Sequence, residues 1–206
     1  MLNIRFKGIC KNEEEIKKNS KLYKNSIMFK EEETIKEHVK KGEKIMIPIA
    51  IIMFIVTLIT ADIKNIELEF DLIDIIISIL MLIPLVILFE AIIALTYPLK
   101  ANKDIYISQK DLTIYLISNS LVSKKRFILI CLMPIILLAV IPYTIMILFM
   151  NAIPIIIIKL IYISSALTCI ISSSIIVDIY NTIKQVPKGA KVFNYGFHSY
   201  WVDKKK

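Results

Sequence analysis

Glycine and cysteine are scarce in this sequence, and each scarcity limits what the protein can be. Only 4 of the 206 residues are glycine while 56% are hydrophobic, a composition that excludes a disordered chain. The three cysteines, Cys10, Cys131 and Cys169, are isolated, so they show neither a disulfide framework nor metal-ligand spacing. The net charge is +8, but no nucleic-acid readout motif accompanies the basic residues, so we expect no nucleic-acid partner.

The apolar residues, in contrast, are abundant and gathered into long runs. A soluble domain of this length lacks the interior volume to bury so much apolar material. The mean hydropathy is +0.67, and four runs approach or exceed the length that crosses a bilayer. We predict spans at about residues 45–61, 72–98, 127–150 and 152–178. The sequence therefore indicates an integral membrane protein, mainly α, with a four-helix bundle.

The last two runs nearly touch, but they cannot form one helix. Residues 127–178 would extend about 78 Å as a single helix, against a hydrocarbon core of about 30 Å. The segment "MNAIP" (150–154) supplies a turn, with Asn151 as a candidate N-cap and Pro154 in the first turn of the next helix.

The basic residues predict the orientation of the spans. Of the 26 lysines and arginines, 12 precede the first run, 6 lie in 99–126 and 6 follow residue 178. The 62–71 loop has only Lys64, and Lys159 lies within the last run, where its side chain can extend outward. The positive-inside rule then places both termini in the cytoplasm and predicts contact with an anionic inner leaflet of the cell membrane.

Three polar segments accompany the spans. Residues 1–44 form a basic cytoplasmic arm, and its i, i+4 acid–base pairs over 13–41 predict a helix, read as a solvated arm or as a surface for lipid or a partner. Residues 104–118, with the turn "SQKD", predict a β-hairpin that either covers the mouth of the bundle or offers an edge to a peptide. The tail 179–206 is aromatic and basic, as is typical of the headgroup zone. Its His198, like His38 in the arm, has no assigned role.

Two acidic residues lie within or at the end of apolar runs. Glu90 lies eight residues before Pro98, and Asp178 ends the fourth run. Both spans run outward to inward, so the two acids reach similar depths near the cytoplasmic face. An ionisable residue inside a membrane indicates a functional site. If the two acids meet, they cannot both stay ionised without a compensating cation or donor. The candidate partners of Glu90 are Tyr97, Tyr180, Asn181 and the cluster 124–126.

Several segments carry a resemblance to a known family: "FEAIIALTYPLKAN", "KKRFILICLMPIILLAVIP", "DIYNTIKQVPKGAKV" and "YGFHSYWV". Together they resemble a bacterial family of small membrane proteins described as putative zincin peptidases, whose plan is similar to that of site-2-type intramembrane metallopeptidases. The resemblance covers roughly residues 45–202. It implies H-E-x-x-H on the second span, with two histidines that bind zinc, a glutamate that activates water, and a later acid as third ligand.

This chain departs from the implied pattern at both histidines. The resemblance places the first histidine at Phe89 and the second at Ile93, while Glu90 keeps the general-base position and Asp178 matches the later acid. Two carboxylates are too few for a catalytic zinc site, which needs three protein ligands and an open position. We therefore expect no metal and no cofactor, and a remnant Glu90 that is inactive. His198 as a substitute ligand is the less favoured reading.

The resulting prediction is a catalytically inactive pseudopeptidase, a binding or regulatory membrane protein with a membrane-protein or peptide partner. Two alternatives stay open. One is an active membrane metalloendopeptidase with non-standard ligands. The other is a small transporter or immunity-type protein that uses Glu90 and Asp178 as proton or cation sites.

Overall fold

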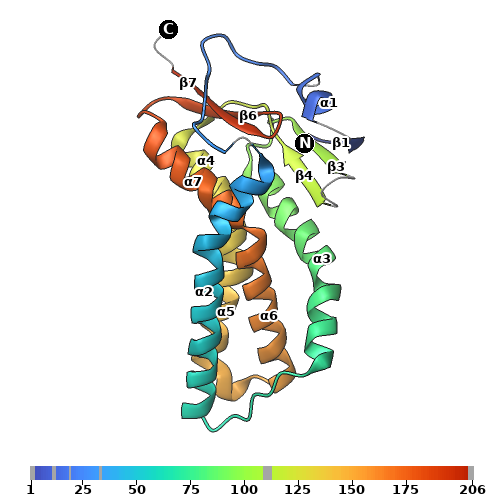
Figure 1. Ribbon diagram of the computed structural model, residues 1–206, viewed down its shortest axis with the longest axis vertical. Helices are drawn as coiled ribbons and strands as arrows, with labels where there is room; N and C mark the ends of the chain where they lie inside the picture. The colour runs from blue at the N-terminus through green and yellow to red at the C-terminus, as the bar shows by residue number, and fades with distance from the viewer. Residues whose placement is uncertain (1–2, 11–12, 19, 33, 109–112, 204–206) are drawn as a thin grey trace.

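The molecule consists of a long helical bundle with strands gathered at one end (Figure 1). The structure, a computed structural model, describes residues 3–10, 13–18, 20–32, 34–108 and 113–203. Both chain ends lie beside the strands, at what we call the sheet end. The opposite end, which carries the 62–71 loop and the turn near Asn151, is the loop end.

The bundle is built from apolar helices long enough to cross a membrane. Among the described residues, three helices are candidate spans: α2 at Ile35–Ile63, α3 at Leu72–Thr96, and a continuous stretch Lys124–Ala152. A fourth is present if α6 and α7, which meet at a 53° bend, are counted as one broken span. The third stretch comprises α4 (Lys124–Ile135), a π-helical turn η1 (Ile136–Val140), α5 (Ile141–Phe149) and a 3-10 turn η2 (Met150–Ala152); the last two helices are α6 (Ile155–Ile171) and α7 (Ser173–Gln185).

Local sequence explains where these helices begin. The Thr34 hydroxyl accepts a hydrogen bond from the Glu37 amide at the start of α2. Asp71 and Asp74 form a reciprocal capping box at the start of α3. The prediction that Asn151 caps the next helix is wrong: Asn151 lies in the 3-10 turn and Pro154 is the N-cap of α6.

Two small sheets form the sheet end. The three-stranded sheet has the order β1-β3-β4, with β1 (Ile4–Cys10) parallel to β3 (Lys103–Ser108) and β4 (Thr113–Ile117) antiparallel to β3. The four-stranded sheet has the order β2-β7-β6-β5, built from β2 (Ile27–Met28), β7 (His198–Val202), β6 (Lys191–Tyr195) and β5 (Val122–Ser123). The strands predicted within 104–118 correspond to β3 and β4, while residues 109–112, most of the "SQKD" turn, lie outside the described residues.

The N-terminal arm differs from its predicted form. Instead of one helix over 13–41, the described residues contain strand β1, a short helix α1 (Glu13–Lys18), an extended stretch with β2, and then α2 from Ile35. Ile16 of α1 is fully buried and packs with Cys10, Tyr106 and Ile117 on the three-stranded sheet. Tertiary packing therefore outweighs the weak i, i+4 pairs that favoured a continuous helix.

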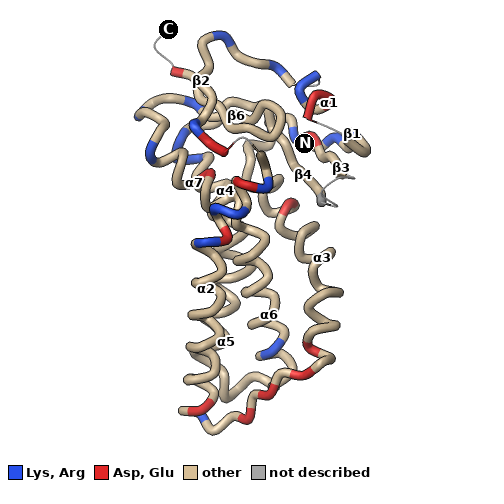
Figure 2. The backbone as a smooth tube through the Cα atoms, viewed as in Figure 1, with Lys and Arg blue, Asp and Glu red and all other residues tan. Residues whose placement is uncertain are grey.

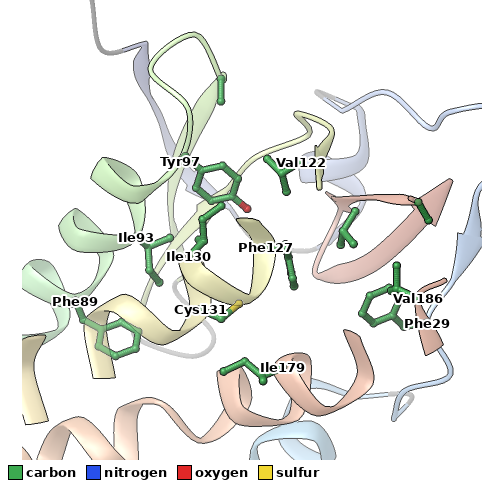
Figure 3. Close-up of a cluster of buried hydrophobic side chains, with 13 residues drawn as sticks. Phe29, Phe89, Ile93, Tyr97, Val122, Phe127, Ile130, Cys131, Ile179 and Val186 are labelled. Carbon is green, nitrogen blue, oxygen red and sulfur yellow. The ribbon is translucent and has the colours of Figure 1, made fainter. Parts of the chain in front are cut away.

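A buried cluster joins the bundle to the four-stranded sheet (Figure 3). It includes side chains from α3, α4, α7 and the strands, among them Phe89, Ile93, Phe127, Ile179 and Val192. Cys131 belongs to this cluster and Cys169 to a smaller one, so both cysteines face the bundle interior as free thiols. This cluster fixes the sheet end of α3 relative to α4 and α7.

Charge is distributed unequally along the long axis (Figure 2). The loop end is mainly acidic, with Asp62, Glu67, Glu69, Asp71 and Asp74, whereas most basic residues lie at the sheet end, together with further acidic residues. The Lys159 ammonium does not extend outward alone, since it pairs with Asp74 of α3 at 2.8 Å. This ion pair ties α6 to α3 at the loop end.

Candidate functional site

A cavity of about 390 Å³ opens at the sheet end, between the bundle and the three-stranded sheet. Helix α3 contributes Phe89, Glu90 and Ile93 to its walls, α7 contributes Asp178, and α2 contributes His38. Strand β4 lines it with residues 114–117, and the N-terminal segment adds Glu31 and Glu32. The cavity therefore collects side chains from elements that are distant in the sequence.

Glu90 and Asp178 both line this cavity. Glu90 comes from the last part of α3, and Asp178 lies in the middle of α7, beyond the bend that follows α6. Both are half-buried. The two acids identified in the sequence are thus brought to one space.

Phe89 and Ile93 fill the positions at which the family resemblance implies imidazole ligands. They lie one helical turn apart on α3, are 2% and 8% exposed, and pack with Tyr97, Ile130 and Cys131 (Figure 3). Neither side chain has a lone pair to offer a metal ion. The residues present on α3 therefore do not fit a zinc site of the H-E-x-x-H kind.

Glu90 has a contact that gives its side chain a structural role. Its side chain accepts a hydrogen bond from the backbone amide of Leu116. Leu116 lies on β4, an edge strand whose second edge has no strand partner within the described residues. An unpaired edge amide needs an acceptor when it is enclosed. Glu90 supplies that acceptor and fastens α3 to the sheet.

The partners expected for Glu90 are engaged elsewhere. The Tyr97 hydroxyl donates to Asn194 at 3.2 Å, and the Lys124 ammonium donates to the carbonyls of Ile183 and Val186. The Arg126 guanidinium donates to the carbonyl of Thr96. Tyr180 accepts from Lys184, and Asn181 lines a different cavity.

Asp178 has a partner that the sequence did not point to. His38 Nε2 lies 3.4 Å from Asp178 Oδ1 and 3.2 Å from the Ser174 carbonyl, while its Nδ1 lies 3.2 Å from Glu32 Oε2. The sequence assigns His38 no role, yet its side chain is only 13% exposed. The one available signal was Gly42, a glycine inside a helix, four residues further along the same face.

Gly42 allows this contact because it lets α2 and α7 approach closely. A Cβ atom at residue 42 would lie 1.7 Å from the Ser173 carbonyl oxygen. No side chain fits in that space, so the two helices touch through backbone here. The close approach brings His38 of α2 within reach of Asp178 of α7.

Glu31 and His198 complete the polar rim of the cavity. His198 Nδ1 lies 2.8 Å from Glu31 Oε1, and the same oxygen accepts from the Ser199 amide at 3.2 Å. The hydrogen bond to Glu31 raises the pKa of His198 above its ordinary value, against the opposing effect of burial. His198, which had no role from sequence, thus anchors the N-terminal segment to β7.

One group of side chains here has the donor set of a metal site. The ligand atoms of Glu31, His38 and Asp178 all lie within 4.8 Å of one another. His38 and Glu31 come from the N-terminal part of the chain, so this group shares only Asp178 with the ligands implied by the resemblance.

The fold and site together define a mainly helical protein with apolar helices able to cross a membrane and an acid-containing cavity near one end. A family model described as "Putative zincin peptidase" matches residues 82–191, more than half of the chain. The chain belongs to this family. No curated protein and no solved structure matches it.

Proposed function

We propose that this chain is a zinc-free pseudopeptidase, a member of the zincin peptidase family that binds or regulates a membrane protein or peptide without hydrolysing it. The observation that carries the proposal is that Phe89 and Ile93, which flank Glu90 on the cavity wall, are buried apolar side chains with no atom that can bind a metal. Hydrolysis by a zincin needs a metal-bound water next to the glutamate. With no nitrogen donors on α3, Glu90 has no such water to activate.

The proposal includes a membrane plan. Four spans cross the cell membrane, the bent pair α6 and α7 forming the fourth, and the sheet end with both termini faces the cytoplasm. The segregation of basic residues to the sheet end and the acidic loop 62–71 at the other end support this orientation.

The cavity supports a binding role because its walls suit an extended apolar segment. Apolar side chains of α3, α4, α6 and β4 form much of its lining, and the polar and acidic groups come mainly from the N-terminal segment, α2 and α7. The edge of β4 that has no neighbouring strand among the described residues also lines the cavity, and such an edge recruits extended peptides. Glu90 occupies the Leu116 amide, so a peptide would pair with the remaining part of this edge.

A second candidate function, metal-dependent hydrolysis with non-standard ligands, is favoured by the group Glu31, His38 and Asp178. The 3.4 Å between His38 Nε2 and Asp178 Oδ1 equals the edge of a tetrahedron around an ion with ligands at about 2.1 Å. The other ring nitrogen of His38 faces Glu32, as the outer nitrogen of a metal-bound histidine commonly faces a carboxylate. Glu31 Oε1 is held by His198 and Ser199, which leaves its second oxygen for a ligand.

Metal analysis of the purified protein after dialysis with zinc separates the two candidate functions. For the pseudopeptidase we expect zinc far below one equivalent in the wild type. The Phe89→His/Ile93→His variant should gain about one zinc per chain, because Asp178 lies on the same cavity. The matched control, Phe89→Gln/Ile93→Gln, makes the same two positions polar but adds no imidazole, and it should stay metal-free.

The opposite results identify the alternative. About one zinc per wild-type chain, lost in His38→Gln, supports the second candidate, and peptide hydrolysis that is also lost in Glu90→Gln would overturn the pseudopeptidase proposal. A folded Phe89→His/Ile93→His variant that takes up no zinc would contradict the mapping of positions 89 and 93 onto the family's ligands.

A further inference from the structure

A second cavity, of about 400 Å³, lies between α2, α7 and the N-terminal segment, away from the acid-containing cavity. Its lining includes Lys30, Lys41 and Lys184, together with Asn181, Ile45 and Val177. Every charged side chain in this lining is a lysine. The nearest compensation comes from Glu32, which pairs with Lys41 at 2.6 Å, and from the Tyr180 hydroxyl, which accepts from Lys184.

Asn181 gives independent evidence that this cavity takes a ligand. The residue is 2% exposed, and its side-chain Nδ2 is buried with no hydrogen-bond partner within the described residues. Leaving a buried donor unsatisfied is unfavourable, so such a group calls for an acceptor. An amide N–H and several ammonium groups are all donors, and an anionic oxygen satisfies them together.

The cavity lies where the polar part of α2 meets its apolar run. Ile45 begins the apolar run of α2, directly after the charged residues 40–44, so the cavity lies where polar sequence gives way to hydrocarbon. Helix α7 leaves the direction of α6 at the 53° bend and exposes Tyr180 and Ile183. Such a helix, with apolar and basic residues side by side, is suited to the membrane interface.

The Lys30 backbone is fixed at the rim of this cavity. The Gln185 side chain accepts from the Lys30 amide at 2.7 Å and donates to the Lys30 carbonyl at 3.0 Å. This two-point contact joins the N-terminal segment to the end of α7. The lysine is therefore held beside the cavity instead of lying on a free arm.

We propose that this cavity binds the phosphate of an anionic phospholipid, with Asn181, Lys30 and Lys184 as donors and Ile45 and Val177 beside the acyl chains. The inference goes beyond the proposed function, since it concerns a separate cavity and holds whether or not the protein binds a metal. It requires only that the sheet end lies at a membrane surface.

Native mass spectrometry of the full-length protein in detergent tests the site with defined lipids. We expect phosphatidylglycerol to bind at least about tenfold more tightly than phosphatidylcholine. Lys30→Gln/Lys184→Gln should weaken phosphatidylglycerol binding by tenfold or more, because each basic residue near an anionic lipid contributes about fivefold. The charge-matched control Lys100→Gln/Lys188→Gln removes two exposed lysines outside the cavity and should change binding less than about twofold.

A second variant keeps the test decisive if the lysines attract anionic lipid only through long-range electrostatics and do not contact it in the cavity. Asn181→Leu removes the unpartnered donor, so it should fold at least as well as the wild type in lipid-free detergent while losing most of the stabilisation that phosphatidylglycerol gives. The proposed site would be overturned if both double lysine variants lost the same phosphatidylglycerol affinity. It would also be overturned if phosphatidylglycerol stabilised folded Asn181→Leu as much as the wild type. Displacement of the lipid by equimolar inorganic phosphate would assign it to a free anion instead.

Discussion

Glu90 shows how the surroundings of a side chain decide which role it can fill. The residue lies on the wall of a cavity, next to the apolar side chains of Phe89 and Ile93. Its carboxylate accepts a hydrogen bond from the Leu116 amide. A catalytic base needs a carboxylate, whereas an acceptor for an edge amide needs only an oxygen. The two roles therefore respond differently to substitution.

We predict that Glu90→Gln leaves the stability of the protein nearly unchanged, while Glu90→Leu lowers it by about 1–3 kcal/mol. Glutamine retains an acceptor oxygen, whereas leucine leaves the Leu116 amide enclosed and unpaired. Hydrogen exchange over residues 114–117 measures this directly, and protection should fall only in Glu90→Leu. Equal protection in both variants would show that Glu90 does not hold β4.

Helices α2 and α7 show how a single small residue sets the geometry of a site. Their approach at Gly42 and Ser173 is too close for any side chain, and it brings His38 to Asp178. The π-helical turn within the third stretch and the bend between α6 and α7 shape the same bundle from the other side. Packing between helices, more than the composition of any one helix, forms the cavity.

Gly42→Ala should destabilise the protein even though alanine favours a helix by about 1 kcal/mol over glycine. The added Cβ would meet the Ser173 carbonyl at 1.7 Å, so α2 and α7 must separate, at a cost of about 1–3 kcal/mol or more. The measurement is thermal unfolding in detergent, with Lys40→Ala, an exposed site on the same helix, as control. A Gly42→Ala protein as stable as Lys40→Ala would contradict this packing.

The whole molecule is polarised, with the strands and most basic residues at one end and a mainly acidic loop at the other (Figure 2). This polarity underlies the proposed orientation and the proposed lipid site. The same polarity gives the protein a sheet end on which the acid-containing cavity, the basic cavity and both termini lie.

Cysteine labelling in intact cells tests the orientation. The native cysteines Cys10, Cys131 and Cys169 are buried, so they contribute little background. We expect Glu67→Cys, in the exposed 62–71 loop, to react with an impermeant maleimide from outside, and Lys188→Cys, at the sheet end, to react only after permeabilisation. The reverse pattern would place the sheet end outside and would remove the lipid site from the inner leaflet.

The sequence by itself determined the apolar helices long enough to cross a membrane, their approximate bounds and the family. Apolar runs of span length form helices because no other structure satisfies the backbone within a bilayer, and this holds without knowledge of their neighbours. The segments around Glu90, Pro98 and Asp178 indicated the family that the family model then showed. The alternation of apolar residues within 104–118 likewise located β3 and β4.

Only the tertiary structure decided what surrounds the acids. Residues 13–41 were predicted as a helix, yet β1, α1 and β2 form there because pairing and burial against distant strands stabilise more than local charge pairs do. His38 meets Asp178, Glu90 meets Leu116, and Lys30 meets Gln185 through contacts that span large sequence separations. Such contacts follow from packing between helices and strands. The hydrophobic periodicity and composition of the sequence predict the elements but not this packing.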